Sequence, residues 1–344
     1  MVSGSIAKTA EDVSGIAFGF MGSKALFAAL HIDLFTLLSI GPRSVSEICE
    51  ATNVPKNRIT TLMTALVSIG LVSYDGEDKI FSNSPGAEAF LVQGAKHGFG
   101  DYLRNQVDKQ MYPFLNQLNE VIDGSLDSDA VDSYQSWMSN VNEAQVYSKA
   151  QHAGSLGPGK TLSRLVDLSA ATSLLDVGGG SGAISIRLLQ AYPNLTSTII
   201  DFPNVAEIGS EYIAEAGLSE RIRYLKGNAL ETMWPTKQDA ILMSYLCSGI
   251  PGVEVPRVIN YAFDCLAPGG TIVIHDFMVE DGRDGPPLAA LWQLQHMAFT
   301  PEALSLTPGW LGVELKRAGF INIDENDMIP GMTRVVHAIK PLND

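Results

Sequence analysis

Apolar residues recur at helical spacing through residues 13–38, and this pattern predicts two packed helices. Ser44-x-x-Glu47 is a capping box that opens the next helix. A third amphipathic helix follows, and after it come two short strand-like runs, Leu71–Tyr74 and Lys79–Ser82. A helix–turn–helix followed by a hairpin predicts a winged-helix domain in this part of the chain.

The next segment, residues 95–165, is mostly helical in pattern and carries scattered aromatic residues. Acidic and small residues at 123–132 predict an exposed loop. The glycines and the proline at 154–159 predict a break in the helix, with a new helix over 160–168.

From residue 173 onwards, strand-like runs alternate with helical patterns, which predicts a parallel sheet covered on both faces. The expected strands are Leu174–Val177, Thr196–Ile200, Ile222–Leu225, Ala240–Ser244 and Thr271–His275. A last helix over Pro308–Ala318 precedes two closely linked strands, Ile321–Glu325 and Arg334–Ile339. Strands linked in this way can pair antiparallel, so we expect an α/β fold whose last strand is reversed.

The charge of the chain excludes nucleic acid as a partner. The formal net charge is −15, whereas phosphate binding needs a basic face. The expected recognition helix of the winged-helix domain offers only Arg58, with Lys56 just before it. We therefore expect a dimerisation or substrate-lid module in place of a DNA reader.

Cysteines and apolar stretches give no sign of an oxidising compartment or a membrane. The three cysteines lie far apart in the sequence and form neither a disulfide framework nor a metal-binding spacing. Residues 13–40 are apolar but are interrupted by Lys24, His31 and Asp33, which favours packed helices over a membrane span. Acidic residues near the first methionine argue against a signal peptide. We expect a cytoplasmic protein without a metal.

The most informative stretch is Ser173–Gly182, S-L-L-D-V-G-G-G-S-G, in which a short apolar strand runs into glycines and then a helix. Glycines let the backbone approach a ligand closely, and the first N–H groups of the helix point at it. Gly178-x-Gly180-x-x-Ala183 also fits a dinucleotide fingerprint, so the motif alone indicates only a nucleotide-like cofactor.

Two later positions fit the same cofactor. Asp201 ends the second expected strand, where a carboxylate can accept hydrogen bonds from both hydroxyls of a ribose. Asn228 and Ala229 follow the third strand, where a polar and a small residue suit a flat base.

Together these motifs resemble the S-adenosylmethionine-dependent O-methyltransferases of the plant and bacterial small-molecule type. The string is L-L-D-V-G-G-G-S-G, then I-I-D-F-P-N-V, R-I-R-Y-L-K-G-N-A-L, L-A-P-G-G-T-I-V-I-H-D and A-G-F. The resemblance covers nearly the whole chain. Asp176, the single glycine site and the reversed last strand favour S-adenosylmethionine over a nicotinamide cofactor.

The resemblance implies a Rossmann-like class I methyltransferase domain behind a winged-helix dimerisation domain. The expected division is a dimerisation domain at 1–110, a helical linker and substrate-cleft segment at 111–165, and the cofactor-binding domain at 166–344. It also implies a homodimer through the first domain and a small-molecule substrate, with S-adenosylhomocysteine as the spent cofactor.

Carried across by motif, the resemblance also implies which residues form the site. The expected cofactor-binding residues are Ser155, Asp176, Gly178, Gly180, Asp201, Phe202, Asn228, Ala229, Met243 and Ser244. The expected acceptor-cleft residues are Trp137, Tyr147, Gln151, His152, Trp292 and His296. The family usually has an acidic residue where Asn228 stands and a lysine where Met243 stands, so both contacts are altered here.

One departure concerns the chemistry itself. The family carries a histidine general base after the fourth strand of the domain, and the matching residue here is Cys247. A positioned base contributes about 10²–10⁴-fold for an acceptor that must lose a proton. Either another histidine replaces it, with His152, His275 and His296 as candidates, or the acceptor has no proton to lose. A methyl transfer needs no covalent step, so Cys247 is not expected to act as a nucleophile.

The absence of a base favours a thioether sulfur as the methyl acceptor. The enzyme would then promote methyl transfer by holding the reactants together and excluding water. The chain is similar to DsyB-type S-methyltransferases, which implies 4-methylthio-2-hydroxybutyrate as acceptor and a sulfonium product for dimethylsulfoniopropionate synthesis. Trp137, Tyr147 and Trp292 are then candidates to stabilise the sulfonium, and Arg104 and Arg283 to bind the carboxylate. The alternatives are an O-methyltransferase acting on a hydroxylated aromatic or secondary metabolite, and a cofactor-binding relative that no longer methylates.

Overall fold

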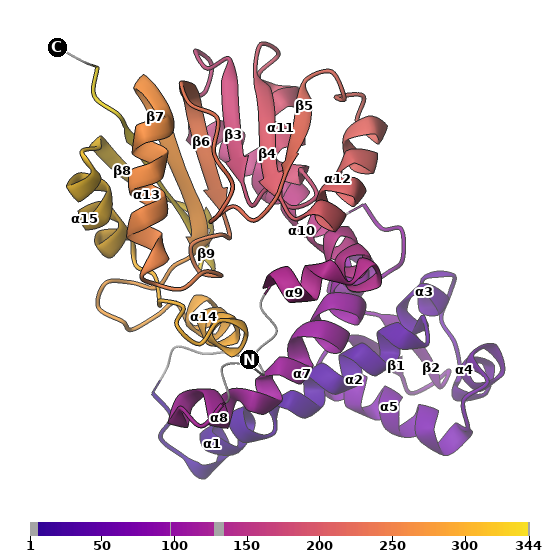
Figure 1. Cartoon of the computed structure of the whole chain (residues 1–344). Coiled ribbons are helices and arrows are strands. Elements are labelled where there is room, and N and C mark those ends of the chain that lie inside the picture. The colour runs from indigo at the N-terminus through magenta and orange to yellow at the C-terminus, as the bar shows by residue number, and fades with distance from the viewer. Residues whose placement is uncertain (1–5, 97, 127–133, 343–344) are drawn as a thin grey trace. The chain divides into compact units, whose positions relative to one another are not determined.

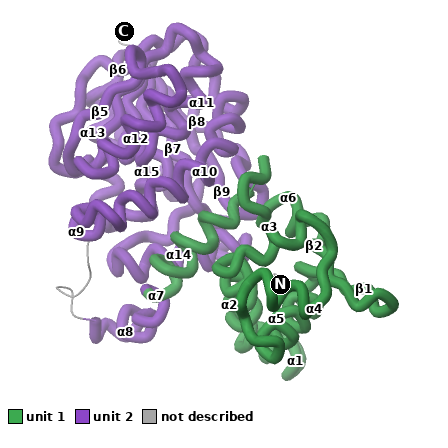
Figure 2. The backbone as a smooth tube through the Cα atoms, turned by 90° about the vertical axis from the view of Figure 1, so that its right-hand side faces the viewer, with its two compact units in different colours: residues 1–113 green, residues 114–344 purple. Residues whose placement is uncertain are grey.

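The computed structural model describes residues 6–96, 98–126 and 134–342, and its backbone divides into two compact units. The first unit is Met1–Pro113 and the second is Phe114–Asp344 (Figure 2). The segment expected to stand apart at 111–165 is thus grouped almost wholly with the second unit, and the three-part division stays a prediction.

The first unit is helical with one small hairpin, as a winged-helix plan requires. Strands β1 (Val72–Asp75) and β2 (Ile80–Asn83) pair antiparallel. The helices that build its core are α2 (Gly19–His31), α3 (Leu34–Ser39), α4 (Val45–Thr52), α5 (Lys56–Ser68), α6 (Pro85–Phe90) and the π-helix η1 (Tyr102–Met111). Helix α1 (Ala10–Ala17) precedes them and buries none of its side chains.

Residues 13–38 form parts of three helices where the sequence predicts two. Phe18 ends α1 with a non-helical backbone, and Asp33 adopts the left-handed region at φ 52°, which separates α2 from α3. The capping box Ser44–Glu47 is present at the start of α4. Local backbone angles at Phe18 and Asp33, which the apolar spacing does not encode, account for the difference.

Helices α1 and α2 carry an exposed apolar surface. Val13, Ile16, Phe18, Phe20 and Met21 are each at least half exposed. Among the described residues, Ala10–His31 is long and apolar enough to cross a membrane, but core helices and signal sequences have the same length and composition. The feature that stands is an apolar surface that no described side chain covers.

The second unit is a seven-stranded sheet with the order β5-β4-β3-β6-β7-β9-β8 (Figure 1). All neighbouring pairs from β5 to β7 are parallel, and β9 lies antiparallel between β7 and β8. The strands are β3 (Ser173–Val177), β4 (Thr196–Asp201), β5 (Ile222–Lys226), β6 (Gln238–Ser244), β7 (Leu266–Phe277), β8 (Ile321–Ile329) and β9 (Thr333–Ile339). The expected α/β class with a reversed last strand is confirmed.

Helices cover both faces of this sheet. Helices α13 (Glu254–Cys265) and α15 (Pro308–Ala318) pack on one face, and α10 (Val141–Leu165), α11 (Ala183–Ala191) and α12 (Pro203–Glu215) pack on the other. The remaining helices of this unit are α7 (Tyr112–Phe114), which begins in the first unit, the 3-10 helix η2 (Leu115–Gln117), α8 (Leu118–Asp123), α9 (Tyr134–Ser139) and α14 (Pro287–Phe299). Part of the expected acidic loop at 123–132 lies outside the described residues.

The predicted break at 154–159 is wrong, because α10 runs without interruption from Val141 to Leu165. A Cβ at Gly159 would lie 2.9 Å from Cβ of Arg187 and 3.1 Å from Cα of Ile184, both on α11. The glycine therefore lets two helices approach closely, and the helix–helix packing it permits outweighs its low helix propensity.

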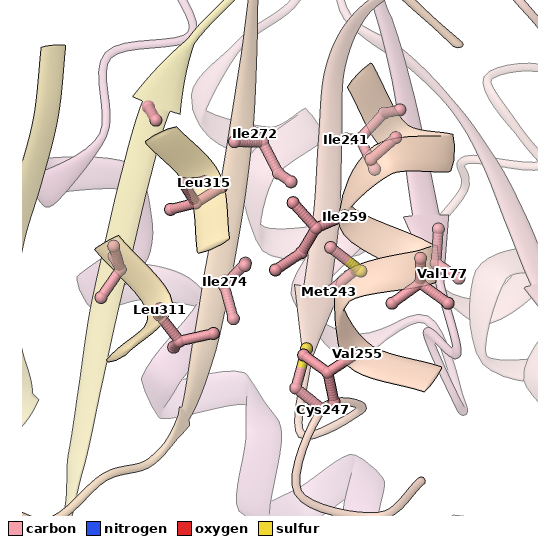
Figure 3. Close-up of a cluster of buried hydrophobic side chains, with 14 of the residues drawn as sticks. Val177, Ile241, Met243, Cys247, Val255, Ile259, Ile272, Ile274, Leu311 and Leu315 are labelled. Carbon is pink, nitrogen blue, oxygen red and sulfur yellow. The ribbon is translucent and has the colours of Figure 1, made fainter. Parts of the chain in front are cut away.

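Alternate residues of the central strands face two separate cores. Ile241 and Met243 of β6 join a cluster with α13 and α15, whereas Ala240 and Leu242 join a cluster with α10, α11 and α12. Figure 3 shows the first cluster, with the sulfur atoms of Met243 and Cys247 among its aliphatic side chains. This alternation decides which residues at the strand ends can reach a ligand.

Candidate cofactor and acceptor site

The glycine turn after β3 is built from left-handed backbone. Gly178, Gly180 and Gly182 have φ of 69°, 58° and 76°, and Gly182 is the N-cap of α11. Between them, a Cβ at Gly179 would lie 2.6 Å from the carboxyl carbon of Asp176. Only glycine satisfies both demands, so the turn folds tightly over Asp176 and leaves the start of α11 open.

Asp201, at the end of β4, is joined to this turn. Its Oδ2 accepts a hydrogen bond from Gly180 N at 2.7 Å, and its Oδ1 accepts one from Phe202 N at 2.7 Å. Burial raises the pKa of Asp201 to about 6, against the effect of these two bonds. Each oxygen keeps a free lone pair, so the carboxylate can still accept the hydroxyls of a ribose.

Asp176 is buried beneath the turn. Its Oδ2 accepts a hydrogen bond from Ser185 Oγ at 2.6 Å, while Oδ1 has no partner among the described residues. Burial raises the pKa of this carboxyl to about 7, and the nearby charge of Asp201 adds to the effect. A buried oxygen without a partner is costly, which points to a donor supplied by a ligand.

Two cavities open around these carboxylates. The smaller, about 70 Å³, lies along the turn and α10 and is lined by Tyr147, Gln151, Ser155, Asp176, Gly178, Gly179, Gly180, Ser181, Ala183, Ile184, Ser244 and Tyr245. The larger, about 370 Å³, has Asp201, Phe202, Asn228 and Ala229 in its wall, where a ribose and a base would lie. The cavities meet at the ends of β3 and β6, the point where the strand order of the sheet reverses.

The rest of the larger cavity is mostly apolar and aromatic. Its other lining residues are Tyr134, Gln135, Met138, Tyr147, Gly178, Gly180, Ile200, Val205, Gly227, Leu230, Tyr245, Leu246, Gly249, Ile250, Pro251, Phe299, Thr300, Pro301 and Glu302. Within the described parts of the chain, this wall holds no histidine, lysine or arginine. Beyond Asp201, the only carboxylate among the wall residues that the structure describes is that of Glu302, which is exposed.

Eleven of the expected site residues line one or both cavities: Tyr147, Gln151, Ser155, Asp176, Gly178, Gly180, Asp201, Phe202, Asn228, Ala229 and Ser244. Their roles stay predictions, but the structure brings them together. Asn228 is also held by a neighbour in the same wall, because its Nδ2 donates to Gln135 Oε1 at 2.9 Å. These residues fit S-adenosylmethionine. Asp176 Oδ1, which has no hydrogen-bond donor among the described residues, and the Asp201 carboxylate lie where the polar groups of the cofactor would bind.

Met243 and Cys247 do not line either cavity. Both are fully buried in the cluster beneath α13, where Figure 3 shows their side chains. Met243 and Ser244 are consecutive residues of β6, so their side chains point to opposite faces of the sheet. Burial raises the pKa of the Cys247 thiol well above its usual value. The neighbouring Ser248 instead uses its backbone N–H and hydroxyl to hold Asp276.

The three candidate replacement bases also lie outside the cavity walls. His275 is buried at the end of β7, with Nδ1 2.9 Å from Ser244 Oγ and Nε2 3.0 Å from Thr333 Oγ1. His152 stacks on Tyr212 with 3.8 Å between ring centroids. Burial lowers the pKa of His275 to about 3 and that of His152 to about 4, so both are neutral in ordinary buffers.

His296 is buried on α14, and the edge of its ring contacts Phe277. Burial lowers its pKa to about 4, and a hydrogen bond with the Ser248 backbone works in the other direction. Its Nδ1 has no partner among the described residues. The ring supports the loop after β6 from behind and is not part of the cavity wall.

The expected aromatic and cationic groups are likewise engaged elsewhere. Trp137 packs against Tyr147 behind the wall, and Trp292 stacks on Phe277 at 4.6 Å. Arg104 belongs to the first unit and pairs with Asp33 and Asp101, while Arg283 donates to the Ser305 carbonyl oxygen at 2.8 Å.

Sequence reasoning missed several wall residues, including Tyr134, Tyr245, Phe299, Thr300 and Glu302. Tyr134 and Phe299 come from helices that the aromatic pattern alone does not place over the sheet. Tyr245 follows Ser244 directly, and the end of a parallel strand beside the glycine turn was the available signal for it.

Comparisons with known proteins agree with this geometry. An O-methyltransferase domain matches residues 130–320, more than half of the chain, and an O-methyltransferase dimerisation domain matches residues 14–93. The chain is 26% identical over 313 residues to the tetracenomycin polyketide synthesis 8-O-methyl transferase TcmO of Streptomyces glaucescens, with 91% of each protein covered. It is 26% identical over 302 residues to the N,N-dimethyltransferase OxyT of Streptomyces rimosus, with 87% of each covered.

The fold also matches a solved structure, human N-acetylserotonin methyltransferase in complex with S-adenosylmethionine. The TM-score is 0.85 at 20% identity, and the match covers 98% of this chain and 99% of the human chain. At this identity the likeness concerns the fold.

Proposed function

The chain belongs to the O-methyltransferase family and uses S-adenosylmethionine as methyl donor, and from that premise we propose that it methylates a hydroxyl group of a small aromatic compound without a histidine base. The observation that carries this proposal is the wall of the larger cavity. It is aromatic and aliphatic, and among its described residues none offers an imidazole or a cation.

The glycine turn and two carboxylates would hold the cofactor. Asp201 would accept hydrogen bonds from the ribose, the unpartnered Oδ1 of Asp176 would accept one from the ammonium group, and Phe202 and Asn228 would flank the base. When bound, S-adenosylmethionine supplies a methyl group on a positively charged sulfur. The chain's contribution is to fix that group against an acceptor in a dry cavity, where orientation is worth several kcal/mol.

The acceptor proton passes to solvent before the transfer. A simple phenol has a pKa of about 10, electron-withdrawing groups on the ring lower that value, and the resulting anion is attracted to the sulfonium in apolar surroundings. His275, His152 and His296 do not line the cavity, and burial lowers their pKa values and makes them weak bases, so none of them takes this proton in our account. Once the cofactor is bound, the rate then follows the ionisation of the acceptor and not the titration of an enzyme base.

A thioether sulfur is the second candidate acceptor, as in 4-methylthio-2-hydroxybutyrate, whose methylation leads to dimethylsulfoniopropionate. The lack of a base in the wall favours it, because a sulfur lone pair has no proton to lose. The carboxylate of such an acid would meet no cation among the described wall residues. The name of TcmO supports a hydroxyl acceptor over a sulfur acceptor. The name of OxyT makes an amine a further acceptor to test.

A mass-spectrometric assay separates these acceptors. The enzyme is incubated with S-adenosylmethionine and, in parallel, with phenolic, amine and thioether-acid acceptors of similar size. We expect a gain of one methyl on the phenol together with S-adenosylhomocysteine. Methylation of the thioether acid alone would replace the first acceptor by the second, and no turnover of the cofactor with any acceptor would favour a non-methylating protein.

We also propose that the protein is a homodimer assembled through its first unit. The dimerisation-domain match and the exposed apolar residues of α1 support this. Val13→Asp with Ile16→Asp should then lower the mass seen by light scattering towards that of one chain, whereas Val253→Asp, at an exposed position of the second unit, should not. A cytoplasmic location stays a prediction that cell fractionation tests.

A further inference from the structure

The two cavities of the second unit share four wall residues, Tyr147, Gly178, Gly180 and Tyr245. The smaller cavity contains Asp176 and the start of α11, which suit an amino-acid group, while the larger contains Asp201, which suits a ribose. In S-adenosylmethionine the sulfonium joins these two parts. The shared residues therefore surround the place where the positively charged sulfur would lie.

Tyr245 has a backbone that an aromatic residue rarely adopts. Its φ is 57°, in the left-handed region, directly after the end of β6. Such a conformation costs about 1–3 kcal/mol and persists only where the surroundings determine it. Strained backbone of this kind is common at ligand-binding sites. Its position at the junction of two cavities therefore points to a role in binding.

The surroundings of Tyr245 hold it firmly. Its N–H donates to the His275 carbonyl oxygen at 2.8 Å. Its ring lies 4.5 Å from the His275 ring and 5.1 Å from the Phe277 ring, both on β7. His275 is itself held by Ser244 and Thr333, so the strand ends form a rigid support behind the tyrosine.

We propose that Tyr245 is a binding residue for the sulfonium of S-adenosylmethionine, with its ring forming an aromatic wall beside the charged sulfur and Tyr147 forming another. Tyr147 is also held in place, because its ring meets Trp137 edge-on at 5.2 Å. An aromatic face attracts a desolvated cation, and the attraction disappears when the sulfur becomes neutral in S-adenosylhomocysteine. The buried His275 acts through Tyr245, as its support. The inference rests on the family's cofactor and does not depend on the acceptor.

Calorimetry with the two cofactor forms tests this inference without any acceptor, so its failure is separate from a failure of the proposed reaction. Tyr245→Leu should weaken binding of S-adenosylmethionine about 3- to 30-fold and change binding of S-adenosylhomocysteine less than about twofold. Tyr245→Phe should leave both affinities near those of the wild type. Tyr74→Leu, an exposed tyrosine on β1, is the matched control.

A second series guards against a Tyr245→Leu protein that does not fold. Phenylalanine and then its mono-, di- and trifluorinated forms at position 245 keep the ring and withdraw electrons from its face. The affinity for S-adenosylmethionine should fall stepwise along the series, while that for S-adenosylhomocysteine stays level. Equal losses for both cofactor forms, or no loss for either, would overturn the proposal.

Discussion

His275 of β7 lies opposite Ser244, the last residue of β6, and Nδ1 of the histidine lies 2.9 Å from Oγ of the serine. The other ring nitrogen is 3.0 Å from Thr333 Oγ1 on β9. The ring thus joins three strands at the edge where the cofactor would lie. Both of its nitrogens are engaged, which leaves none to accept a proton from an acceptor.

His275→Gln should therefore lower stability more than catalysis. Losing one of the two buried hydrogen bonds costs about 1–3 kcal/mol of unfolding free energy. Loss of a true general base would cost about 10²–10⁴-fold in rate, and we expect a fall of about tenfold or less. Urea unfolding and steady-state kinetics on the same preparation measure both effects.

The same substitution changes the response to acid. The pKa of His275 is lowered to about 3, so its contribution to stability is complete above its usual pKa of 6.5 and is lost as pH falls towards 3. Between these two pH values, the free energy of unfolding of the wild type falls by about 1.4 kcal/mol for each unit that the pH is lowered, through this residue. His275→Gln should lack this pH-dependent contribution to the free energy of unfolding. The contributions of His152 and His296 are the same in both proteins and cancel in the comparison. Identical pH slopes for the two proteins would contradict the buried neutral state.

Ser248 and Asp276 form a second buried pair, in which Ser248 Oγ donates to Oδ1 at 2.5 Å and its N–H donates to Oδ2 at 3.0 Å. Burial raises the pKa of Asp276 to about 6, and these bonds oppose the rise. Ser248→Ala should raise this pKa further and cost about 1–3 kcal/mol.

The sign of the pH effect follows from that rise. A carboxyl with a raised pKa loses its stabilising contribution as pH increases through the folded value, so Ser248→Ala should be more damaging at pH 8 than at pH 5. Ser210→Ala, which removes a hydroxyl bonded only within α12, is the control and should show no such difference. Equal costs at both pH values for Ser248→Ala would mean that the pair carries no charge.

Gly159 and Gly157 lie two residues apart on α10 in opposite environments. A Cβ at Gly159 meets α11 at 2.9 Å, whereas one at Gly157 meets nothing within 4 Å. Gly157→Ala should stabilise the protein by about 0.5–1 kcal/mol, because alanine favours a helix. Gly159→Ala should destabilise it by about 1–3 kcal/mol through overpacking. Thermal unfolding of the two variants measures the contrast, and two shifts of the same sign would refute this packing.

Asp201 should contribute equally to both forms of the cofactor. Asp201→Asn keeps one oxygen for two backbone N–H groups and a ribose, so it should weaken S-adenosylmethionine and S-adenosylhomocysteine alike, by roughly 10- to 100-fold. Asp167→Asn, at an exposed position outside both cavities, should change neither. If calorimetry finds a loss of affinity for only one form of the cofactor, Asp201 does not bind the ribose.

Much of the sheet could be predicted from the sequence, because buried parallel strands are short apolar runs between helices. The expected runs at 174–177 and 196–200 each match an observed strand within a residue at either end. The helix over Pro308–Ala318 has the predicted bounds, since Thr307 caps its start and Gly319 its end. The cofactor residues near the glycine turn could also be predicted from the sequence, because the topology of a parallel sheet places the ends of neighbouring strands together.

Other features depend on tertiary contacts that no local pattern carries. Gly159 reads as a helix breaker until α11 is placed against it. Cys247 lies in the loop after β6, beside the cavities, yet its thiol faces the core. The chain turns at Tyr245 in a conformation that its residue type does not suggest. The roles of Trp137, Trp292 and His296 were expected from chemistry alone, and packing places them behind the wall.

The central claim, methyl transfer to an aromatic hydroxyl without an enzyme base, is tested most directly by pH profiles of kcat/KM for phenolic acceptors of graded acidity. We predict that each profile rises with pH and levels off at the pKa of its own acceptor, so that the break moves from one acceptor to the next. With S-adenosylmethionine at saturation, a break common to all the acceptors at a pH above the pKa values of Asp176 and Asp201 would reveal an enzyme base and would contradict the account.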